Sequence, residues 1–378
     1  MATELPARSV ALVLGTRPEL VKLAPVVHHL GAAARLVHTG QHWDTAMSGR
    51  FLDELGLPEP ERLTGVGGTS RAVQIGRSLE QLDTLFAGDL PRAVVVQGDT
   101  NATLAGALAA NARAIPLVHV EAGLRSHDPA MPEEHNRILV DSVSDLLCAA
   151  TPENRANLLA EGVPAERIAV TGNTVVEAVR DALPSPAVRA ALLARDGLVP
   201  DRYILATVHR PENTDDTAAL RAVLTELAAL AAAGTPVVLP LHPRTRARVA
   251  EAGLGALLDA VQVIEPLGYG EFLALARHCA LLVSDSGGVQ EECTVLGRPL
   301  VVVRRSTERP EAMADFAHLV SPGPEIGRLA RFRLAQGAAG LHRLSLLPSP
   351  YGDGHAAERV AALVTSLALP GAARPLAA

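Results

Sequence analysis

The residues that could carry chemistry lie where short apolar segments end. Asp99 and Glu121 each stand at the end of a β-branched run, and Glu133 opens a helical pattern. Three carboxylates at one sheet edge suit general acid–base chemistry, because like charges in a cleft push pKa values apart. Each residue also has an ordinary structural explanation: an N-cap for Asp99, a helix-dipole partner for Glu133 and a solvated helix face for the nearby Arg137. The pattern indicates an acid–base site and leaves these explanations open.

Two cations, Arg17 and Lys22, follow the first short apolar run of the chain. Thr16 and Glu19 predict a capping box at the start of a helix here. Capping does not explain the two cations, because the helix dipole disfavours positive charge near an N-terminus. We therefore expect them to meet an anionic ligand.

Polar residues also follow the strands predicted for the second half of the chain. His209 stands beside an arginine at the end of one run, where a histidine can contact phosphate or move a proton. In Ser284–Glu292 a strand leads into a Ser-Gly-Gly turn that opens a helix, whose free N–H groups suit a diphosphate. Glu292, one turn inside, suits a ribose diol, although no G-x-G-x-x-G is present. The alternative is an ordinary glycine-rich turn.

Short β-branched runs alternate with Ala/Leu helical patterns along the chain. Strands that are apolar on both faces and separated by helices are typical of parallel sheets covered by helices. The pattern restarts near residue 173, so we predict two doubly wound α/β domains, 1–173 and 174–353, followed by a helical segment, 354–378. Residues 321–348 give no readable period. Ligands of such sheets bind at the carboxyl ends of the strands, where the polar residues lie.

The chain has 378 residues, of which 48% are hydrophobic, and a net charge of −7 from 34 basic and 41 acidic residues. This charge excludes a general polyanion-binding protein, so we expect no nucleic-acid partner. Five Phe, three Tyr and one Trp leave an aliphatic core. Three widely spaced cysteines predict neither a disulfide framework nor a metal site and favour a cytoplasmic setting. We identify no signal peptide or membrane-spanning run.

A set of specific motifs runs from Gly15 to about Pro310, and a further match follows at Pro350–Gly354. The motifs are GTRPELVKLAP, TGQH, QGDTNATLAG, HVEAGLRS, MPEEHNR, TGNTVVEAV, HRPEN, DSGGVQEE and TERPEA. On these motifs most of the chain resembles the non-hydrolysing UDP-N-acetylglucosamine 2-epimerases. The resemblance implies a glycosyltransferase-B-like fold with the active site in the interdomain cleft and a C-terminal helix that packs back on the first domain. It also implies a UDP-sugar substrate, a homodimer, and no metal or redox cofactor.

The resemblance also implies a role for each matching residue. Asp99, Glu121 and Glu133 match the catalytic carboxylates, and His209 matches a diphosphate-facing histidine and proton donor. The substrate-binding positions are Arg17, Lys22, Arg137, Phe272, Ser286, Gly287, Gly288, Glu292 and Arg309, with Arg17 and Phe272 at the uridine. The implied reaction removes the C2 proton and expels UDP to give a 2-acetamidoglucal, to which UDP adds back.

Two segments and one residue depart from the family pattern. The loop Arg125–Glu133 is shorter than in the best-studied bacterial members and resembles a subgroup that acts in part on other sugars, including diacetamido uronic acids. Ala314–Ala317 replaces a Gly-containing stretch, and Asp44 stands where many members carry Gln or Glu near a regulatory nucleotide site. The alternatives are a 2-epimerase of another UDP-hexosamine, a glycosyltransferase, or an inactive nucleotide-sugar sensor. The complete carboxylate set argues against the sensor.

Overall fold

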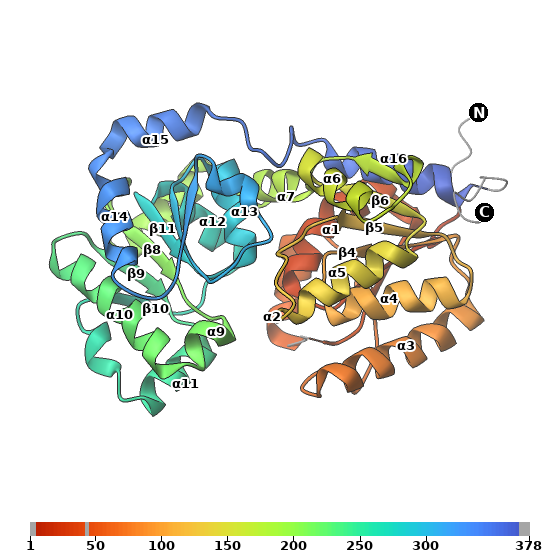
Figure 1. Ribbon diagram of the computed structural model, residues 1–378, viewed down its shortest axis with the longest axis horizontal. Helices are drawn as coiled ribbons and strands as arrows, with labels where there is room; N and C mark the ends of the chain where they lie inside the picture. The colour runs from red at the N-terminus through yellow and green to blue at the C-terminus, as the bar shows by residue number, and fades with distance from the viewer. Residues whose placement is uncertain (1–4, 42–44, 370–378) are drawn as a thin grey trace. The chain divides into compact units, whose positions relative to one another are not determined.

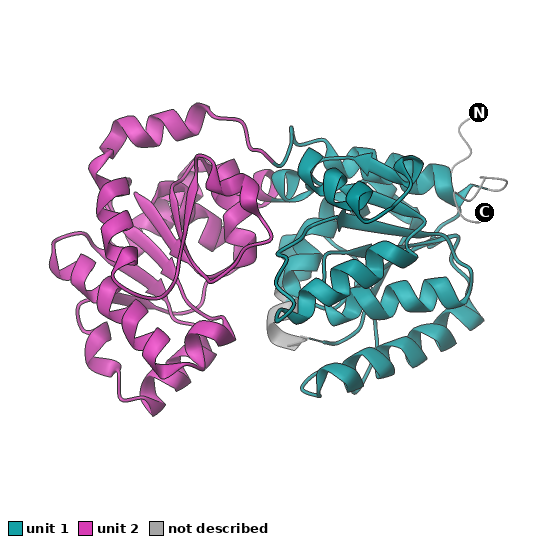
Figure 2. Cartoon of the chain, in the orientation of Figure 1, with its two compact units in different colours: residues 1–178, 351–378 teal, residues 179–350 magenta. Residues whose placement is uncertain are grey.

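The chain folds into two compact units (Figure 2). A computed structural model describes residues 5–41 and 45–369, so Asp44 lies outside the described residues. Unit 1 combines Met1–Ala178 with Tyr351–Ala378, and unit 2 is Val179–Pro350. The boundary falls within a helix rather than at the predicted residue 173, because the buried first turn of that helix packs with unit 1.

Unit 1 contains a seven-stranded sheet in the order β3-β2-β1-β4-β5-β6-β7, in which all neighbouring strands are parallel. Its strands are β1 (Val10–Leu14), β2 (Ala34–His38), β3 (Glu61–Arg62), β4 (Ala93–Gln97), β5 (Leu117–Ala122), β6 (Leu146–Ala149) and β7 (Ile168–Val170). Its helices are α1 (Arg17–Leu30), α2 (Thr45–Glu54), α3 (Arg71–Gly88), α4 (Asn101–Ala112), α5 (Pro132–Val143), α6 (Pro152–Ala160), the start of α7 (Val175–Ala182) and, from the far end of the chain, α16 (Ala356–Ala368).

Unit 2 contains a six-stranded parallel sheet in the order β10-β9-β8-β11-β12-β13. Its strands are β8 (Ile204–Thr207), β9 (Val237–Pro240), β10 (Gln262–Ile264), β11 (Leu281–Ser284), β12 (Leu300–Val303) and β13 (Ala317–Val320). Its helices are α8 (Pro186–Arg195), α9 (Pro211–Thr214), α10 (Thr217–Ala232), α11 (Pro243–Glu251), α12 (Tyr269–His278), α13 (Gly287–Leu296), α14 (Glu325–Ala335) and α15 (Gly337–Leu346).

Both sheets have the winding of a dinucleotide-binding fold, which confirms the predicted pair of doubly wound α/β domains (Figure 1). The strand order reverses between β1 and β4 in unit 1 and between β8 and β11 in unit 2. Ligands of such sheets bind at the carboxyl ends of the strands beside this reversal. Asp99 and His209 follow strands beside this reversal, and Glu121 lies at the end of β5. The other predicted site residues lie in loops after strands or in the first two turns of the following helices, so the topology gathers them at one edge of each sheet.

The core of unit 1 lies on both faces of its sheet. Along β1, Val10, Leu12 and Leu14 pack into one cluster, while Ala11 and Val13 pack into the other. This alternation requires helices on both faces, since successive strand side chains point to opposite sides. Helix α16 packs against α1 and contributes Val360 and Val364 to the first cluster. The C-terminal helix therefore completes the core of unit 1.

The structure contains elements that the sequence pattern did not predict. Residues 321–348, which gave no readable period, contain the whole of the two helices α14 and α15. Arginines interrupt their apolar pattern, yet the buried Ile326 and Ala330 face the core while Arg328 pairs with Glu325 at the surface. Strand β3 was also missed, because two residues carry no detectable period. Strand β13, the sixth of its sheet, follows the atypical segment noted after the TERPEA motif.

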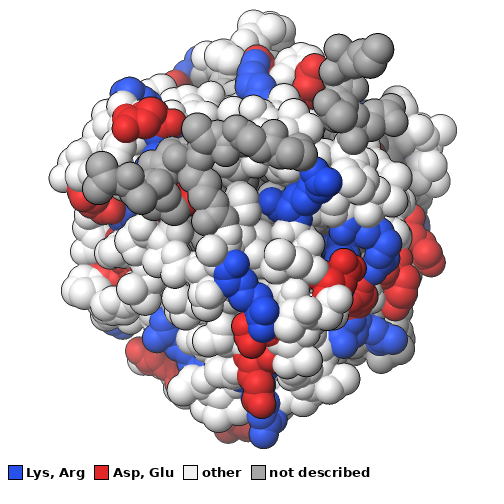
Figure 3. Space-filling view, turned by 90° about the vertical axis from the view of Figure 1, so that its right-hand side faces the viewer, with Lys and Arg blue, Asp and Glu red and all other residues white. Residues whose placement is uncertain are grey.

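The face of the molecule in Figure 3 carries basic and acidic side chains interspersed among uncharged ones. Among the residues that the structure describes, no helix is both long enough and apolar enough to cross a membrane.

Gly123 follows β5 directly, and its backbone packs so closely against α6 that a side chain would not fit. Its φ is +81°, and a Cβ there would lie 2.3 Å from the carbonyl oxygen of Asn154. Gly162 has a similar φ of +86° but nothing within 4 Å. We expect Gly162→Ala to lower the free energy of unfolding by about 1 kcal/mol, from the backbone alone. Gly123→Ala should cost more than about 3 kcal/mol in urea unfolding, because the contact forces the backbone to move. Equal losses would contradict this explanation.

Candidate active site

The loop after β1 is fastened by Glu19 in a way that differs from the predicted capping box. Thr16 accepts no bond from the helix backbone. Its hydroxyl instead donates to Oε2 of Glu19 at 2.8 Å, and the Gly15 amide donates to the same oxygen at 2.9 Å. The other oxygen, Oε1, accepts from the hydroxyls of Thr100 at 2.9 Å and Thr103 at 3.1 Å. The capping prediction was wrong because Glu19 is almost fully buried and bonds to the loop after β4.

Burial makes the carboxyl group of Glu19 a weaker acid than an exposed glutamate. Burial raises its pKa to about 7, although the bonds from Gly15 and the threonine hydroxyls each act to lower the pKa. The carboxyl group of Glu19 therefore titrates near neutral pH.

Lys22 and Glu121 form a buried ion pair. Nζ of Lys22 lies 2.5 Å from Oε2 of Glu121, which also accepts from Nε2 of Gln97 at 2.5 Å. Glu121 itself has a φ of +68°, in the left-handed region that non-glycine residues rarely adopt, and β5 has a register shift at this point. A bulge and a strained residue at a strand end are devices that aim a side chain away from the regular ladder.

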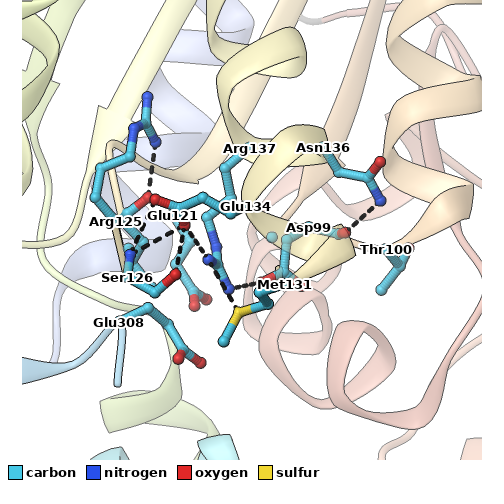
Figure 4. Close-up of polar contacts among 12 residues, drawn as sticks. Asp99, Thr100, Glu121, Arg125, Ser126, Met131, Glu134, Asn136, Arg137 and Glu308 are labelled. Carbon is cyan, nitrogen blue, oxygen red and sulfur yellow. Dashed lines mark hydrogen bonds and ion pairs between the residues drawn. The ribbon is translucent and has the colours of Figure 1, made fainter. Parts of the chain in front are cut away.

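Asp99 and Arg137 form a second ion pair (Figure 4). Nη2 of Arg137 lies 2.5 Å from Oδ2 of Asp99, and Nη1 lies 2.5 Å from Oε2 of Glu134. Arg137 is buried, so the alternative of a solvated helix face is wrong. Asp99 is not the N-cap of α4 either, because Thr100 occupies that position. Asn136 donates to the backbone oxygen of Asp99 at 2.8 Å and holds the same loop.

The paired glutamates that open α5 differ in their surroundings. Glu134 is buried and accepts from the amides of Ser126 and His127, which fixes the loop before α5. Burial raises the pKa of Glu134, but these amides and Arg137 outweigh it and leave the pKa below its usual range. Glu133 is only half-buried and makes no hydrogen bond or ion pair within the described part of the chain. Glu134 was missed because adjacent glutamates cannot be told apart by sequence.

A buried network behind β5 supports this edge of the sheet. Oδ1 of Asp141 lies 2.6 Å from Nδ1 of His119, whose Nε2 lies 2.9 Å from the backbone oxygen of Gly98. Oδ2 of Asp141 accepts from Arg125 at 2.7 Å and from the Gly123 amide at 3.2 Å. Burial raises the pKa of Asp141, but His119 and Arg125 outweigh it and lower the pKa. The network therefore fixes the backbone on both sides of Glu121 and just before Asp99.

In unit 2, the turn Ser286–Gly288 opens helix α13, as the sequence pattern predicted. A Cβ on Gly287 would lie 3.1 Å from Nη1 of Arg309 and 3.4 Å from Nη2 of Arg210. Two guanidinium groups therefore stand beside the free N–H groups of the first helical turn. Both features favour an anion.

Arg309 belongs to a buried charge network that sequence reasoning did not find. Its Nε lies 2.8 Å from Oε1 of Glu291, and it also pairs with Glu308. Glu308 in turn pairs with the fully buried Arg304 at 3.1 Å. Burial lowers the pKa of Arg304, and the carboxylate of Glu308 opposes that shift. The network fixes the guanidinium of Arg309 against α13.

His209 is held at the end of β8 through its backbone. The amides of His209 and Arg210 donate to Oδ2 of the fully buried Asp285 at 3.0 and 2.9 Å. Nδ1 of His209 lies 3.3 Å from Oδ1 of the same carboxylate, while 41% of the His209 side chain is exposed. Asp285 therefore orients a histidine that remains accessible to a ligand.

Glu292 lies one turn inside α13, where it accepts from the hydroxyl of Tyr269 at 3.2 Å. Burial, followed by the charge of Glu292, raises the pKa of Tyr269 well above its usual value. Phe272 is half-buried on the same helix as Tyr269, three positions later, so the two rings share a helix face. The remaining predicted residue, Arg17, is exposed at the start of α1.

Comparison with known proteins decides the family. A profile of UDP-N-acetylglucosamine 2-epimerases matches residues 27–365. The chain belongs to this family of isomerases. A UDP-N-acetylglucosamine 2-epimerase of Methanococcus maripaludis is 39% identical over 80% of this chain and 85% of its own length. This agreement confirms the resemblance found in the motifs.

Two further members of the 2-epimerase family are informative about structure and substrate. The crystal structure of the Methanocaldococcus jannaschii UDP-GlcNAc 2-epimerase in complex with UDP-GlcNAc and UDP has a TM-score of 0.85 at 36% identity, covering 94% of this chain and 99% of that chain. A UDP-2,3-diacetamido-2,3-dideoxy-D-glucuronate 2-epimerase of Pseudomonas aeruginosa is 38% identical over 94% of this chain and 99% of its own length.

The raised pKa of Glu19 predicts a pH-dependent stability. The unfolded chain releases this proton near pH 4.5, whereas the folded protein keeps it to about pH 7. Raising the pH through this window therefore destabilises the native protein, and Glu19→Gln removes the effect. We therefore compare the free energies of unfolding of the variant and the parent protein by urea unfolding. As the pH rises from 4.5 to 8, the free energy of unfolding of the variant should increase by about 2–3 kcal/mol relative to that of the parent. Glu153→Gln, an exposed first-turn glutamate of α6, serves as control. If the difference in unfolding free energy between Glu19→Gln and the parent protein did not change with pH, the raised pKa of Glu19 would be contradicted.

Proposed function

We propose that this protein interconverts UDP-N-acetylglucosamine and UDP-N-acetylmannosamine by elimination and re-addition of UDP. The observation that carries the proposal is the pair of carboxylates Asp99 and Glu121. They lie at the ends of the neighbouring strands β4 and β5, and each bonds to a buried cation from a different helix. Acidic groups held at a sheet edge suit proton transfer to and from a sugar carbon.

The C2 proton of the substrate is barely acidic because it is not next to a carbonyl group. Its removal must therefore be coupled to departure of a stabilised leaving group. In the forward step the C2–H and C1–O bonds break, the C1–C2 double bond forms, the proton passes to a carboxylate, and the C1–O electron pair leaves with UDP. In the return step UDP attacks C1 and a proton is delivered to the other face of C2.

In this proposal, the carboxylates of unit 1 have distinct duties. Asp99 and Glu121 exchange the proton, while Arg137 and Lys22 hold them in place. Glu133, half-buried and without a protein partner among the described residues, is available to the sugar as the third carboxylate. The resemblance supports these assignments, and the ion pairs give each cation a positioning role in addition to the substrate contact expected from sequence.

Unit 2 is the proposed site of the nucleotide. The N–H groups of Gly287 and Gly288, the hydroxyl of Ser286 and the guanidinium of Arg309 bind the diphosphate, and the accessible His209 protonates it or stabilises its charge. Glu292 accepts from the ribose hydroxyls. Phe272 stacks on the uracil, and the family resemblance assigns Arg17 to the uridine as well. These groups stabilise UDP as it leaves, which is where the reaction needs charge compensation.

A second substrate is favoured by one specific observation. The Pseudomonas aeruginosa relative named for UDP-2,3-diacetamido-2,3-dideoxy-D-glucuronate is about as similar to this chain as the relatives named for UDP-N-acetylglucosamine. The short loop Arg125–Glu133 also resembles that subgroup. The same chemistry at C2 would serve either sugar, so the assay must include both.

The test is incubation with each UDP-sugar in D2O, followed by NMR at C2. We expect deuterium at C2 together with formation of the manno epimer. Asp99→Asn and Glu121→Gln should each slow this exchange at least about 100-fold. Both variants should keep UDP affinity within about threefold, because the proposed diphosphate contacts lie in unit 2.

Glu80→Gln, an exposed carboxylate on α3, is the matched control and should retain full exchange. Exchange only on the diacetamido uronate would select the second substrate. Absence of exchange on any UDP-hexosamine would exclude the epimerase reaction, and loss of UDP binding in Asp99→Asn would exclude its proton-transfer role.

We further propose a cytoplasmic homodimer, an assembly implied by the resemblance. All three cysteines are buried as free thiols, and burial raises their pKa values, which suits a reducing compartment. Light scattering should give a molar mass of twice the 39.4 kDa of one chain. A mass of one chain at micromolar concentration would exclude the dimer.

A further inference from the structure

Glu19 is a buried carboxylate that the proposed reaction leaves unused. Among the described residues, the Gly15 amide and the hydroxyls of Thr16, Thr100 and Thr103 lie within hydrogen-bond distance of its two oxygens. The Thr103 hydroxyl, which has one proton, lies closer to the backbone oxygen of Gln97, at 2.7 Å. By contrast, Asp99, Glu121 and Asp141 each bond to a basic side chain. Burying a carboxylate without a cation is costly, so such a group persists where its hydrogen bonds serve a purpose.

The two oxygens of Glu19 serve two different loops. Within the part of the chain that the structure describes, Oε2 accepts from the loop after β1, at Gly15 and Thr16. Oε1 lies within hydrogen-bond distance of the hydroxyls of Thr100 and Thr103, which begin α4 after β4. These strands flank the reversal of strand order in unit 1. One carboxylate therefore bridges the two loops at the point where this fold binds its ligands.

Each bridged loop carries a residue of the proposed site immediately beside the bond. Arg17 follows Thr16, and Asp99 precedes Thr100. The loops are also closely packed, because a Cβ on Gly15 would lie 2.6 Å from Cβ of Ala102. A shift of either loop would displace its functional side chain, and displacements near 1 Å can cost about 100-fold in rate.

We propose that Glu19 is a positioning residue that fastens the loop carrying Arg17 to the loop carrying Asp99. The roles of Arg17 and Asp99 rest on the proposed function, whereas the fastening rests on the hydrogen bonds alone. Glu19 acts through the two loops and does not touch the substrate.

The variant Glu19→Gln tests the fastening with little change in volume. An amide offers one acceptor oxygen and one donor nitrogen, so it cannot accept from both loops at once. Thr16→Val is a milder variant that removes one bond to Oε2 and leaves the helix cap unchanged, since Thr16 makes no capping bond. Glu153→Gln is the matched control, because Glu153 also lies in a first helical turn after a threonine and proline but is exposed.

Two measurements at pH 8 are made on the full chain: amide hydrogen exchange of residues 15–17 and 98–101, and kcat for epimerisation of the active UDP-hexosamine. For Glu19→Gln we expect faster exchange in both loops and a kcat about 10- to 100-fold lower. UDP affinity should also fall, because Arg17, which the proposed function places at the uridine, lies on one of the two loosened loops. Glu153→Gln should match the parent protein in both measurements.

Thr16→Val should lower kcat less than Glu19→Gln, and the double variant should be no slower than Glu19→Gln alone. When two residues act through one shared interaction, either substitution removes the same contribution to kcat, so the effects of the two substitutions do not add. Additive losses would overturn the shared role of Glu19.

The outcomes separate this inference from the proposed function. If the parent protein epimerises but Glu19→Gln has unchanged kcat, the positioning role is overturned. Unchanged hydrogen exchange in Glu19→Gln overturns the fastening itself. If the parent protein exchanges C2 on no UDP-hexosamine, the proposed function fails, and hydrogen exchange alone decides the fastening: faster exchange in both loops supports it.

Discussion

Every paired strand in both units is parallel to its neighbours, and this constraint determines where polar groups can lie. Parallel strands cannot be joined by tight turns, so a helix must return the chain between them. Each crossover leaves the sheet at the carboxyl end of a strand, and the following helix begins there with free N–H groups. Both faces of the sheet are covered, which leaves this edge as the place where charged side chains meet a ligand. The positions of the two candidate sites, one in each unit, are consequences of that geometry.

Four carboxylates of unit 1 near this edge differ in how deeply they are buried. Glu133 is half-buried, Asp99 and Glu121 bond to buried cations, and Asp141 lies deepest with its two basic partners. Each carboxylate carries a larger desolvation cost with depth, and each deeper one has more bonds to offset it. Glu19 does not follow this trend, because a backbone amide and threonine hydroxyls hold it in place of a basic side chain.

Most of the fold and many of the site residues could be predicted from sequence, because both depend on local patterns. Strand ends marked by Asp99, His209 and the Ser-Gly-Gly turn are visible as a change from β-branched to polar residues. Glu19 was misread, because its local spacing from Thr16 matches a capping box while its decisive partners lie more than eighty residues away. Arg125 and Asp141 were missed for the same reason. Long-range hydrogen bonds leave no periodic signal.

The return of α16 to unit 1 has a consequence for biosynthesis. Unit 2 is an insertion between Ala178 and Tyr351, so the ribosome releases the whole of unit 2 before it releases Val360 and Val364. Until then the α1 face of the first sheet lacks one of the helices that pack on it, and the apolar side chains that α16 buries stay exposed. Unit 2 is contiguous in the chain and can close its own core during synthesis. The earliest-made part of this protein is therefore the last to finish folding, and its exposed face must be kept from aggregation in the meantime.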